Sequence, residues 1–293
     1  MDETKSTGER LLTGYFDRFS VEHIHRYAIA ERFAAAKSVL DIACGEGYGS
    51  NLMSTAARHV VGVDIDPNVI KHAAEKYTRP NLTFSLGSVD KIPLCDASID
   101  LVVSFETLEH HDKHEEMYRE IKRVLRPSGI LLISTPDKKH FSDETGHRNA
   151  YHVKELYREQ FLSLNSRYFS NVAIYSQRFM MGSVVCSPQC TSPITFFSGD
   201  LVGVQFQAEL NSPTYHICIA SDSTLDQIDH SIFYSQPLLE KMEEKIFELE
   251  EEVEACKKRA DALGQQHSDL LQSTSFRVGQ ALLSPLRRIL GRT

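Results

Sequence analysis

The chain has 293 residues, 41% of them hydrophobic, and a formal net charge of −8. This length fits one α/β domain of about 200 residues plus an appendage. The acidic balance disfavours a nucleic-acid partner, because phosphate binding needs a basic surface. No apolar run approaches the roughly 18 residues of a membrane span. The charged start at 1–5 lacks the apolar core of an export signal, so we expect a cytoplasmic protein whose six cysteines stay reduced.

Short apolar runs recur through the first half of the chain, at 38–43, 60–64, 82–86, 99–104 and 130–134. Helical patterns separate them, among them 67–77, which opens with a proline, and 114–125. Strands that alternate with helices predict right-handed crossovers and a parallel sheet with helices on both faces.

The alternation of strand-like and helix-like segments stops after Pro136. The polar stretch 137–151 is typical of a loop, and 153–161 predicts a short helix. Two closing strands are expected at 172–175 and 215–220, with an irregular insertion rich in Ser, Pro and Gly at 180–213 between them. The globular domain is expected to occupy 37–222, preceded by helices at 1–36.

Residues 237–271 carry an uninterrupted seam of alternating three- and four-residue steps, which predicts a coiled coil and a homo-oligomer. The alternative is one long solvated helix that lies on the domain. The seam consists of Leu239, Met242, Ile246, Leu249, Val253, Cys256, Ala260, Leu263, His267 and Leu270.

The last segment, 272–293, has four arginines and no acidic residue, whereas 236–269 has a net charge of −5. Its apolar residues fall partly at helical spacing, so a basic amphipathic tail is predicted, with Pro285 dividing it into two short helices. Such a tail suits either an anionic membrane surface or a partner protein. Packing of the tail on its own coil is the simpler alternative.

A glycine loop follows the first predicted strand, in the sequence Asp-Ile-Ala-Cys-Gly-Glu-Gly-Tyr-Gly at 41–49. Asp64 ends the next strand, where a carboxylate can accept hydrogen bonds from a ribose diol. The glycine spacing departs from the dinucleotide pattern, and Asp41 and Glu46 oppose a pyrophosphate. These acids suit a ligand with ammonium and sulfonium groups, such as S-adenosylmethionine (SAM).

Together with 61–67, 87–93, 104–110 and 123–129, this loop resembles the motifs of class I SAM-dependent methyltransferases, in order and in spacing over about residues 37–136. The resemblance implies a Rossmann-like sheet of seven strands whose last inserted strand is antiparallel. It also implies that the cofactor contacts Asp41, Gly45, Gly47, Asp64, Ile65, Ser88, Val89 and Phe105. Many relatives have Asp at the position of Ser88, which puts its contact with adenine in doubt, although the Val89 backbone could serve.

Arg26 lies in a segment that forms a cofactor-capping helix in similar methyltransferases. It could pair with the SAM carboxylate in a bidentate contact, or it could be a surface residue of an amphipathic helix. Glu106 is a candidate partner for the SAM ammonium or for the acceptor.

Methyl transfer to a hydroxyl needs a base, and three histidines are candidates: His110, His111 and His152. His110 and His111 follow the fourth strand, at the sheet edge where such sites form. His110 could alternatively only orient its loop. Asn149 and Tyr151 are expected to line the acceptor pocket, and no metal cluster of convincing spacing is found.

The block 149–161 resembles methyltransferases of bacterial surface-polysaccharide (O-antigen) assembly, and the tail motif at 273–279 resembles a segment beside coiled coils in glycan-assembly proteins. The acceptor implied is a sugar hydroxyl or a terminal phosphate of a glycan or lipid-linked glycan. A glycosyltransferase complex is an implied partner, and a peripheral position on the inner face of the membrane is an option. The alternatives are a small-molecule or quinone-type methyltransferase and a non-catalytic scaffold that presents the coil.

Overall fold

The structure is a computed structural model that describes residues 17–180, 196–199, 204–207, 210, 212–226 and 228–289. The chain divides into two compact units, Met1–Tyr234 and Ser235–Thr293. Residues 1–16, which begin the N-terminal helices expected at 1–36, lie outside the described residues.

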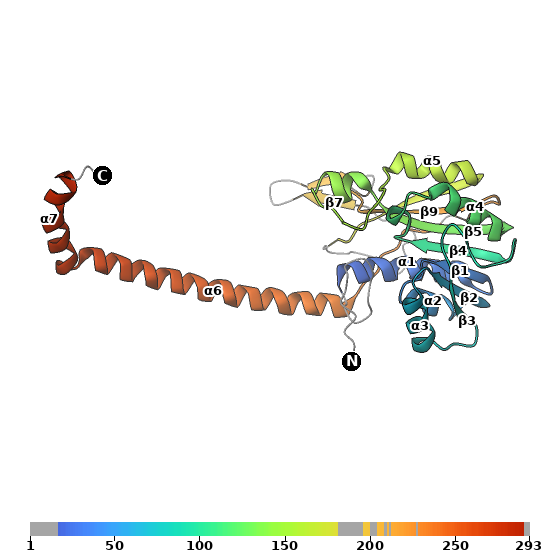
Figure 1. Cartoon of the computed structure of the whole chain (residues 1–293), viewed down its shortest axis with the longest axis horizontal. Helices are drawn as coiled ribbons and strands as arrows, with labels where there is room; N and C mark the ends of the chain where they lie inside the picture. Colours follow the sequence, from blue (N-terminus) through green and yellow to red (C-terminus); the bar gives the residue numbers. More distant parts are fainter. Residues whose placement is uncertain are drawn as a thin grey trace. The chain divides into compact units, whose positions relative to one another are not determined.

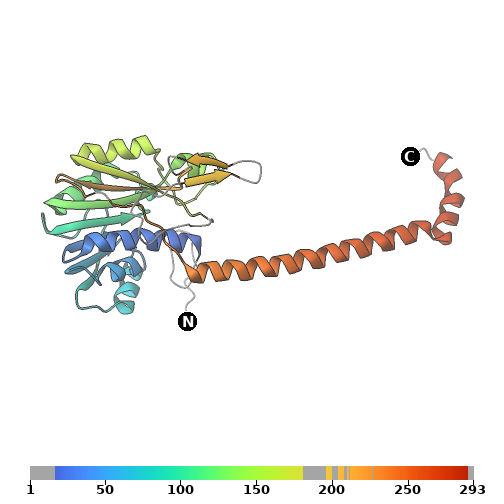
Figure 2. The ribbon, with the colours of Figure 1, turned by 180° about the vertical axis from the view of Figure 1, so that it is seen from behind.

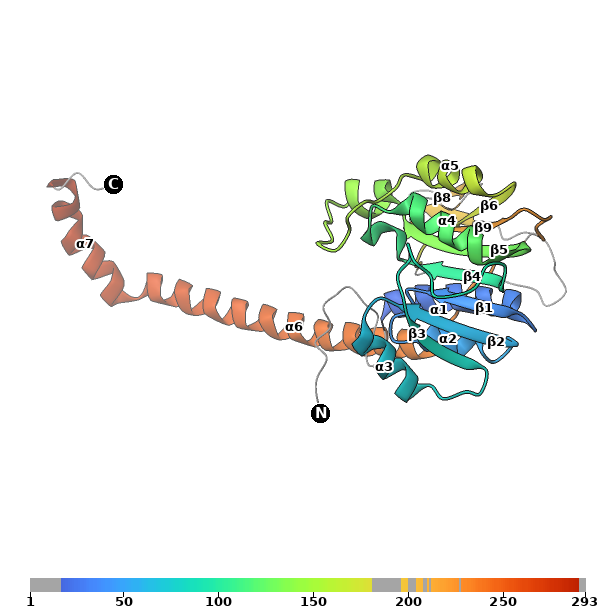
Figure 3. The same ribbon diagram turned by 45° about the vertical axis from the view of Figure 1, so that its right-hand side comes forward.

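The first unit contains a seven-stranded sheet in the order β3-β2-β1-β4-β5-β9-β6, which Figure 3 shows edge to edge. β9 runs antiparallel to both of its neighbours, and the pairings among the other strands are parallel. This confirms the seven-stranded sheet with an inserted antiparallel strand. The strands are β1 (Ser38–Ile42), β2 (His59–Asp64), β3 (Leu82–Leu86), β4 (Ile99–Phe105), β5 (Leu125–Pro136), β6 (Asn171–Gln177) and β9 (Tyr215–Ser221).

Helices cover both faces of this sheet, as expected (Figure 1). On one face, α1 (Arg18–Ala34) and α2 (Tyr48–Met53) pack on Val39, Val60 and Leu101. On the other, α4 (His114–Val124) and α5 (Arg158–Tyr168) pack on a second set of strand residues. Because both faces are covered, the central strands are buried almost throughout and do not alternate between apolar and polar residues.

Local signals set the helix starts. Asp17 caps α1 by accepting a hydrogen bond from the Ser20 amide, and Asp66 caps α3 (Pro67–Lys76) through the Asn68 amide. The proline at the first position of α3 is favourable because its missing N–H would have no helical partner. Both helices therefore begin where short-range chemistry places them.

Two expectations for the region after β5 are wrong. The stretch 137–151 is not all loop, because Lys139–Asp143 forms one π-helical turn. The helix predicted at 153–161 begins later, at Arg158, and extends to Tyr168. The backbone amides of Val153 and Lys154 instead donate to the carbonyl of Glu109, so a tertiary contact holds this segment out of the helix.

The insertion predicted as irregular contains a two-stranded antiparallel sheet, β7 (Phe196–Gly199) and β8 (Val204–Gln207), outside the main sheet (Figure 2). Serine, proline and glycine interrupt the apolar residues around these strands, so no continuous apolar run marks them in the sequence. Residues 181–195, which include Cys186 and Cys190, lie outside the described part of the chain.

The second unit is helical, with α6 (Gln236–Gln272) followed by α7 (Thr274–Ile289). The break falls at Ser273, and α7 continues through Pro285, so the predicted division of the tail at that proline is wrong. Of the helices in the described ranges, none combines the length and apolar character of a bilayer span. α6 confirms a helix over the seam, while self-association of that helix stays a prediction.

Candidate functional site

The candidate site lies at the carboxyl edge of the sheet, where β1, β2 and β4 end. The strand order reverses direction at β1, which has β2 on one side and β4 on the other. Open α/β sheets bind ligands outside the carboxyl ends of the strands at such a switch point.

The glycine loop and Asp64 meet directly. Asp64 is buried, and its Oδ2 accepts a hydrogen bond of 3.0 Å from the Gly45 amide, while Oδ1 accepts one of 3.0 Å from the Asp66 amide. Gly45 and Gly47 have φ angles of +53° and +87°, a region that glycine adopts without strain. A Cβ on Gly47 would lie 2.7 Å from the Phe84 ring, so this loop position also needs glycine for space.

Asp41 occupies the same edge, buried at the end of β1. Its carboxylate accepts hydrogen bonds from Ser50 Oγ at 2.6 Å and from the Tyr27 hydroxyl at 3.2 Å. Burial raises the pKa of Asp41 to about 6, although these two hydrogen bonds act to lower it. Ser50 and Tyr27 were not among the predicted site residues, because nothing local marks them as partners of Asp41.

Apolar side chains border the ends of β2 and β3. Ile65 is 68% exposed directly after Asp64, and Leu86, which the sequence analysis did not single out, is 53% exposed at the end of β3. Ser88 Oγ donates to Asp90, and Val89 packs partly into the core. The Ser88 hydroxyl is therefore committed to its own loop, so a contact with an adenine would come from the backbone.

Arg26 is fully buried, which excludes the surface role considered for it. Its Nη1 donates to Gln177 Oε1 at 2.6 Å, and its guanidinium lies 4.8 Å from the centre of the Tyr215 ring. Within the described ranges, Nε and Nη2 of Arg26 have no hydrogen-bond partner. Buried guanidinium donors without acceptors are costly, so this position fits an anion.

Glu106 lies beside Arg26, with Oε1 3.8 Å from Arg26 Nη2. It follows β4 with a φ of +52°, which is strained for a residue other than glycine, and Ser134 Oγ donates to its carboxylate at 2.6 Å. Phe105, one residue earlier, is buried edge-to-face against Tyr27, 5.0 Å between ring centres. Phe105 thus forms a wall of the site and links α1 to the end of β4.

Four of the predicted substrate and base residues come together after the end of β4. His110 Nδ1 donates to the Tyr151 carbonyl at 3.0 Å, because a carbonyl can only accept. The His110 and His152 rings lie edge-to-face at 5.2 Å, and Asn149 Nδ2 donates to His152 Nε2 at 3.0 Å. Residues some forty positions apart in sequence therefore form one group.

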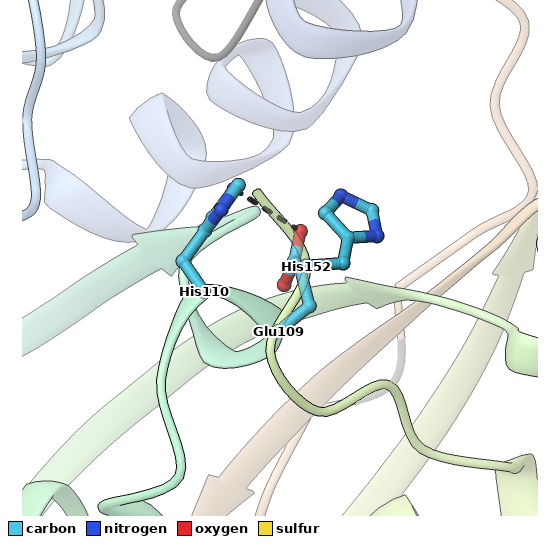
Figure 4. Close-up of side chains that lie close together, drawn as sticks. All are labelled: Glu109, His110 and His152. Carbon is cyan, nitrogen blue, oxygen red and sulfur yellow. Dashed lines mark ion pairs between the residues drawn. The ribbon is translucent and has the colours of Figure 1, made fainter. Parts of the chain in front are cut away.

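Glu109 is the member of this group that the sequence analysis missed (Figure 4). It is buried, with Oε1 4.0 Å from His110 Nε2, and Thr135 Oγ1 donates to its Oε2 at 3.2 Å. Burial first, and then the charge of Glu106, raise the pKa of Glu109 well above its ordinary value. This favours a neutral carboxylic acid beside His110.

Glu109, His110 and His152 each offer a ligand atom within 4.8 Å of the others, so they could hold a metal ion. The sequence spacing gave no sign of this cluster. Both ring nitrogens of His152 already have partners, Nδ1 with Glu155 and Nε2 with Asn149. Hydrogen bonding accounts for the arrangement, and a metal would have to displace the Asn149 amide or the Glu155 carboxylate.

His111 is not part of this group. Its ring packs edge-to-face on His114 at 5.5 Å, and its two ring nitrogens are buried and lack partners among the residues described. Burial, followed by the charges of His114 and His110, lowers the pKa of His111 to about 4. The neutral form is therefore favoured, and the position suits packing better than proton transfer.

A second acid–histidine pair lies past the end of β5 and escaped the sequence analysis. His140 Nδ1 donates to the buried Asp137, whose other oxygen is 3.7 Å from His216 Nε2. Burial acts to raise the pKa of Asp137, but the nearby His216 ring and the hydrogen bond from His140 outweigh it and lower the pKa. Only the antiparallel insertion of β9 brings His216 here, so no local motif could have marked it.

Comparison with known proteins agrees with this geometry. The family described as "Methyltransferase domain" matches residues 40–133. A probable S-adenosylmethionine-dependent methyltransferase of Mycolicibacterium smegmatis is 36% identical over 154 residues, which cover 51% of this chain and 59% of that protein. A probable phthiotriol/phenolphthiotriol dimycocerosates methyltransferase of Mycobacterium ulcerans is 30% identical over 120 residues, or 40% of this chain and 46% of that protein.

A solved structure from Bacillus halodurans, named as a candidate methyltransferase, shares the fold with a TM-score of 0.50 at 16% identity, over 68% of this chain and 99% of its own. The chain spans about half the length of the curated relatives described above. Residues 40–133 match the methyltransferase family, and the strand order and the glycine loop with Asp64 fit the class I SAM-dependent methyltransferase domain. SAM is the cofactor of that family.

Proposed function

We propose that the chain is a SAM-dependent methyltransferase that methylates an oxygen nucleophile of a cell-surface glycan or of its lipid-linked precursor. The observation that carries the methyltransferase part is the pairing of Asp64 with the Gly45 amide at the end of β2. This contact fixes a carboxylate beside the open turn of the glycine loop, where it would accept hydrogen bonds from both ribose hydroxyls.

The residues present fit the rest of the cofactor. Arg26 Nε and Nη2 are buried donors that lack acceptors in the described part of the chain, and the SAM carboxylate would supply them. Glu106, 3.8 Å from Arg26 Nη2, is placed for the adjacent ammonium. Ile65 and Leu86 offer exposed apolar surface for the adenine. When bound, SAM supplies a methyl group on a sulfonium, which is a good leaving group.

His110 would serve as the base. The Tyr151 carbonyl holds the proton on Nδ1, so the lone pair lies on Nε2, the atom that faces Glu109. A proton taken from an acceptor hydroxyl would create an imidazolium 4.0 Å from Glu109 Oε1. The oxygens of the neutral Glu109 carboxyl group carry partial negative charge and would stabilise the new positive charge, so no second proton has to leave the site.

The glycan acceptor is supported by two sequence resemblances, the block 149–161 and the tail motif 273–279. Asn149 and Tyr151 of the first block belong to the His110 group, since the Tyr151 carbonyl accepts from His110 and Asn149 Oδ1 accepts from the Tyr151 amide. The relative from M. ulcerans is named for a lipid substrate, so a lipid alcohol is the competing acceptor.

Methyl-labelled SAM offered with separate pools of glycans, lipid-linked glycans, lipids and small metabolites tests this function. We expect label in a glycan or lipid-linked glycan pool, released by treatments that cleave methyl ethers or phosphate methyl esters. Label confined to lipids or metabolites would replace the acceptor assignment. Tight SAM binding with no labelled pool would favour the scaffold alternative.

A further inference from the structure

α6 exposes an apolar seam to solvent along its whole length. Within the second unit, the seam side chains are 39% exposed at Leu239, 46% at Ile246, 51% at Val253 and 58% at Leu270. Scattered exposed apolar residues are ordinary, but a continuous stripe with a 3.5-residue period is typical of a surface that another helix covers.

The middle of this stripe is hollowed. The hollow is lined by Leu249, Glu252, Val253, Cys256, Lys257 and Ala260. In a coiled coil each seam side chain inserts between four residues of the facing helix. These six residues form two overlapping sets of four. One set is Leu249, Glu252, Val253 and Cys256, and the other is Val253, Cys256, Lys257 and Ala260. The surface therefore has the shape that the seam of a second helix would fill.

We propose that α6 pairs with α6 of a second copy of this chain as an antiparallel two-stranded coiled coil. The seam is symmetric about its midpoint, between residues 254 and 255. In the antiparallel register every seam residue therefore meets one from the second copy, with none left over. The layers are Leu239–Leu270, Met242–His267, Ile246–Leu263, Leu249–Ala260 and Val253–Cys256.

Side-chain size favours this orientation over the parallel one. A parallel coil would stack identical residues, with an Ala260 layer and a Cys256 layer too small to fill the interface and a His267 layer that brings two imidazoles together. The antiparallel layers set Ala260 against Leu249 and Cys256 against Val253. Pairing small with large residues gives layers of more even volume, as close packing requires.

The distribution of charge along α6 also favours the antiparallel orientation. Residues 236–254 carry eight glutamates and two lysines, whereas 255–272 carry three basic and two acidic residues. Oppositely charged residues beside the seam can pair across the interface in either orientation, so these pairs do not distinguish a parallel coil from an antiparallel one. A parallel coil, however, would place the two strongly acidic halves side by side, while the antiparallel coil sets each against the weakly basic half of the other copy.

The first test is the mass of the full chain in solution, by sedimentation equilibrium. We expect the mass of two chains, reduced to one chain by Ile246→Asp on the seam. Phe247→Asp is the matched control, because Phe247 is the adjacent residue, is 62% exposed and lies off the seam. A monomeric wild-type chain, a trimer, or equal effects of the two substitutions would overturn the proposal.

The second test fixes the orientation. Two proteins, Leu239→Cys and Leu270→Cys, are made in a background in which the exposed Cys95 and Cys256 are replaced by serine. They are mixed, oxidised and digested, and the linked peptides are identified by mass spectrometry. The antiparallel coil joins position 239 of one chain to 270 of the other. Links of 239 to 239 or 270 to 270 would establish the parallel coil and refute the orientation, independently of any methyltransferase activity.

Discussion

Among single residues, Asp64 has two roles. Its carboxylate accepts a hydrogen bond from the glycine loop, and it supplies the negative charge that would bind the ribose hydroxyls. We expect Asp64→Asn, which keeps the size of the side chain, to weaken SAM binding by roughly tenfold or more, because two charge-assisted hydrogen bonds worth about 1.5–3 kcal/mol each would be lost or weakened. Calorimetry measures this directly. Asp96→Asn is the control, an exposed acid in the β3–β4 connection. Unchanged affinity in folded Asp64→Asn would remove the ribose assignment.

His110 and His140 are the two histidines whose geometry suits a base. We expect His110→Gln to lower turnover by about 10²–10⁴-fold with little change in SAM affinity, and to remove the ionisation of the base from the rate profile. Single-turnover kinetics across pH, with His140→Gln in parallel, provide the measurement. A large loss in His140→Gln and a loss below about tenfold in His110→Gln would move the base to the Asp137–His140 pair.

Asp41 gives the fold a pH dependence of its own. Its pKa rises from the ordinary 3.8 to about 6 on folding, so the folded state holds the proton more tightly. The protonated Asp41 side chain therefore stabilises the folded state fully below pH 3.8, and this stabilisation is lost as the pH rises through 6. The free energy of unfolding changes by about 3 kcal/mol across this range.

Asp41→Asn stays neutral, so its stability relative to the wild type should increase between pH 4 and 7. Near-UV circular dichroism of tyrosine follows the first unit alone, because all 11 tyrosines precede residue 235. A difference in melting temperature that does not vary with pH would contradict the assignment.

At the scale of elements, the contact of α2 with α1 positions the glycine loop. Gly49 lies in the first turn of α2, where a Cβ would come within 2.0–2.4 Å of the Tyr27 ring. Gly49→Ala must push the two helices apart, at a cost of about 1–3 kcal/mol. Because Tyr27 also holds Asp41, SAM affinity should fall together with stability.

Gly264→Ala is the control for this substitution, since the added methyl group meets nothing within 4 Å beyond its chain neighbours and the local backbone of its own helix. It should stabilise α6 by about 1 kcal/mol and leave the tyrosine signal unchanged. A melting temperature of Gly49→Ala equal to that of the wild type would show that α1 and α2 are not packed as described.

For the whole molecule, the basic tail remains a proposed attachment segment. Val278, Leu282 and Leu283 of α7 are at least 52% exposed, and residues 272–293 carry a charge of +4. Four arginines near an anionic membrane would contribute about 4 kcal/mol, at about 1 kcal/mol each. We expect the full chain, but not a chain that ends at Leu271, to float with anionic liposomes. Equal behaviour of the two would leave a partner protein as the ligand of the tail.

The amino-acid sequence by itself determined the repeating units of the fold. Apolar runs, helix caps and the glycine loop are local signals, and they placed five parallel strands, α3, α4 and the Asp64 site close to their observed positions. The seam of α6 is also a local signal, since it depends on apolar residues spaced three and four positions apart within one segment. These features depend on short-range chemistry that neighbouring residues already contain.

Only the tertiary structure decided which distant side chains share an environment. Arg26 meets Gln177 and Tyr215, and Glu109 meets His152, because the crossovers and the antiparallel β9 bring separate strand ends to one edge. A long-range contact of the same kind, from the Val153 and Lys154 amides to the Glu109 carbonyl, delayed α5 to Arg158. Burial and pairing of this kind arise from the closing of the sheet, and no local pattern encodes them.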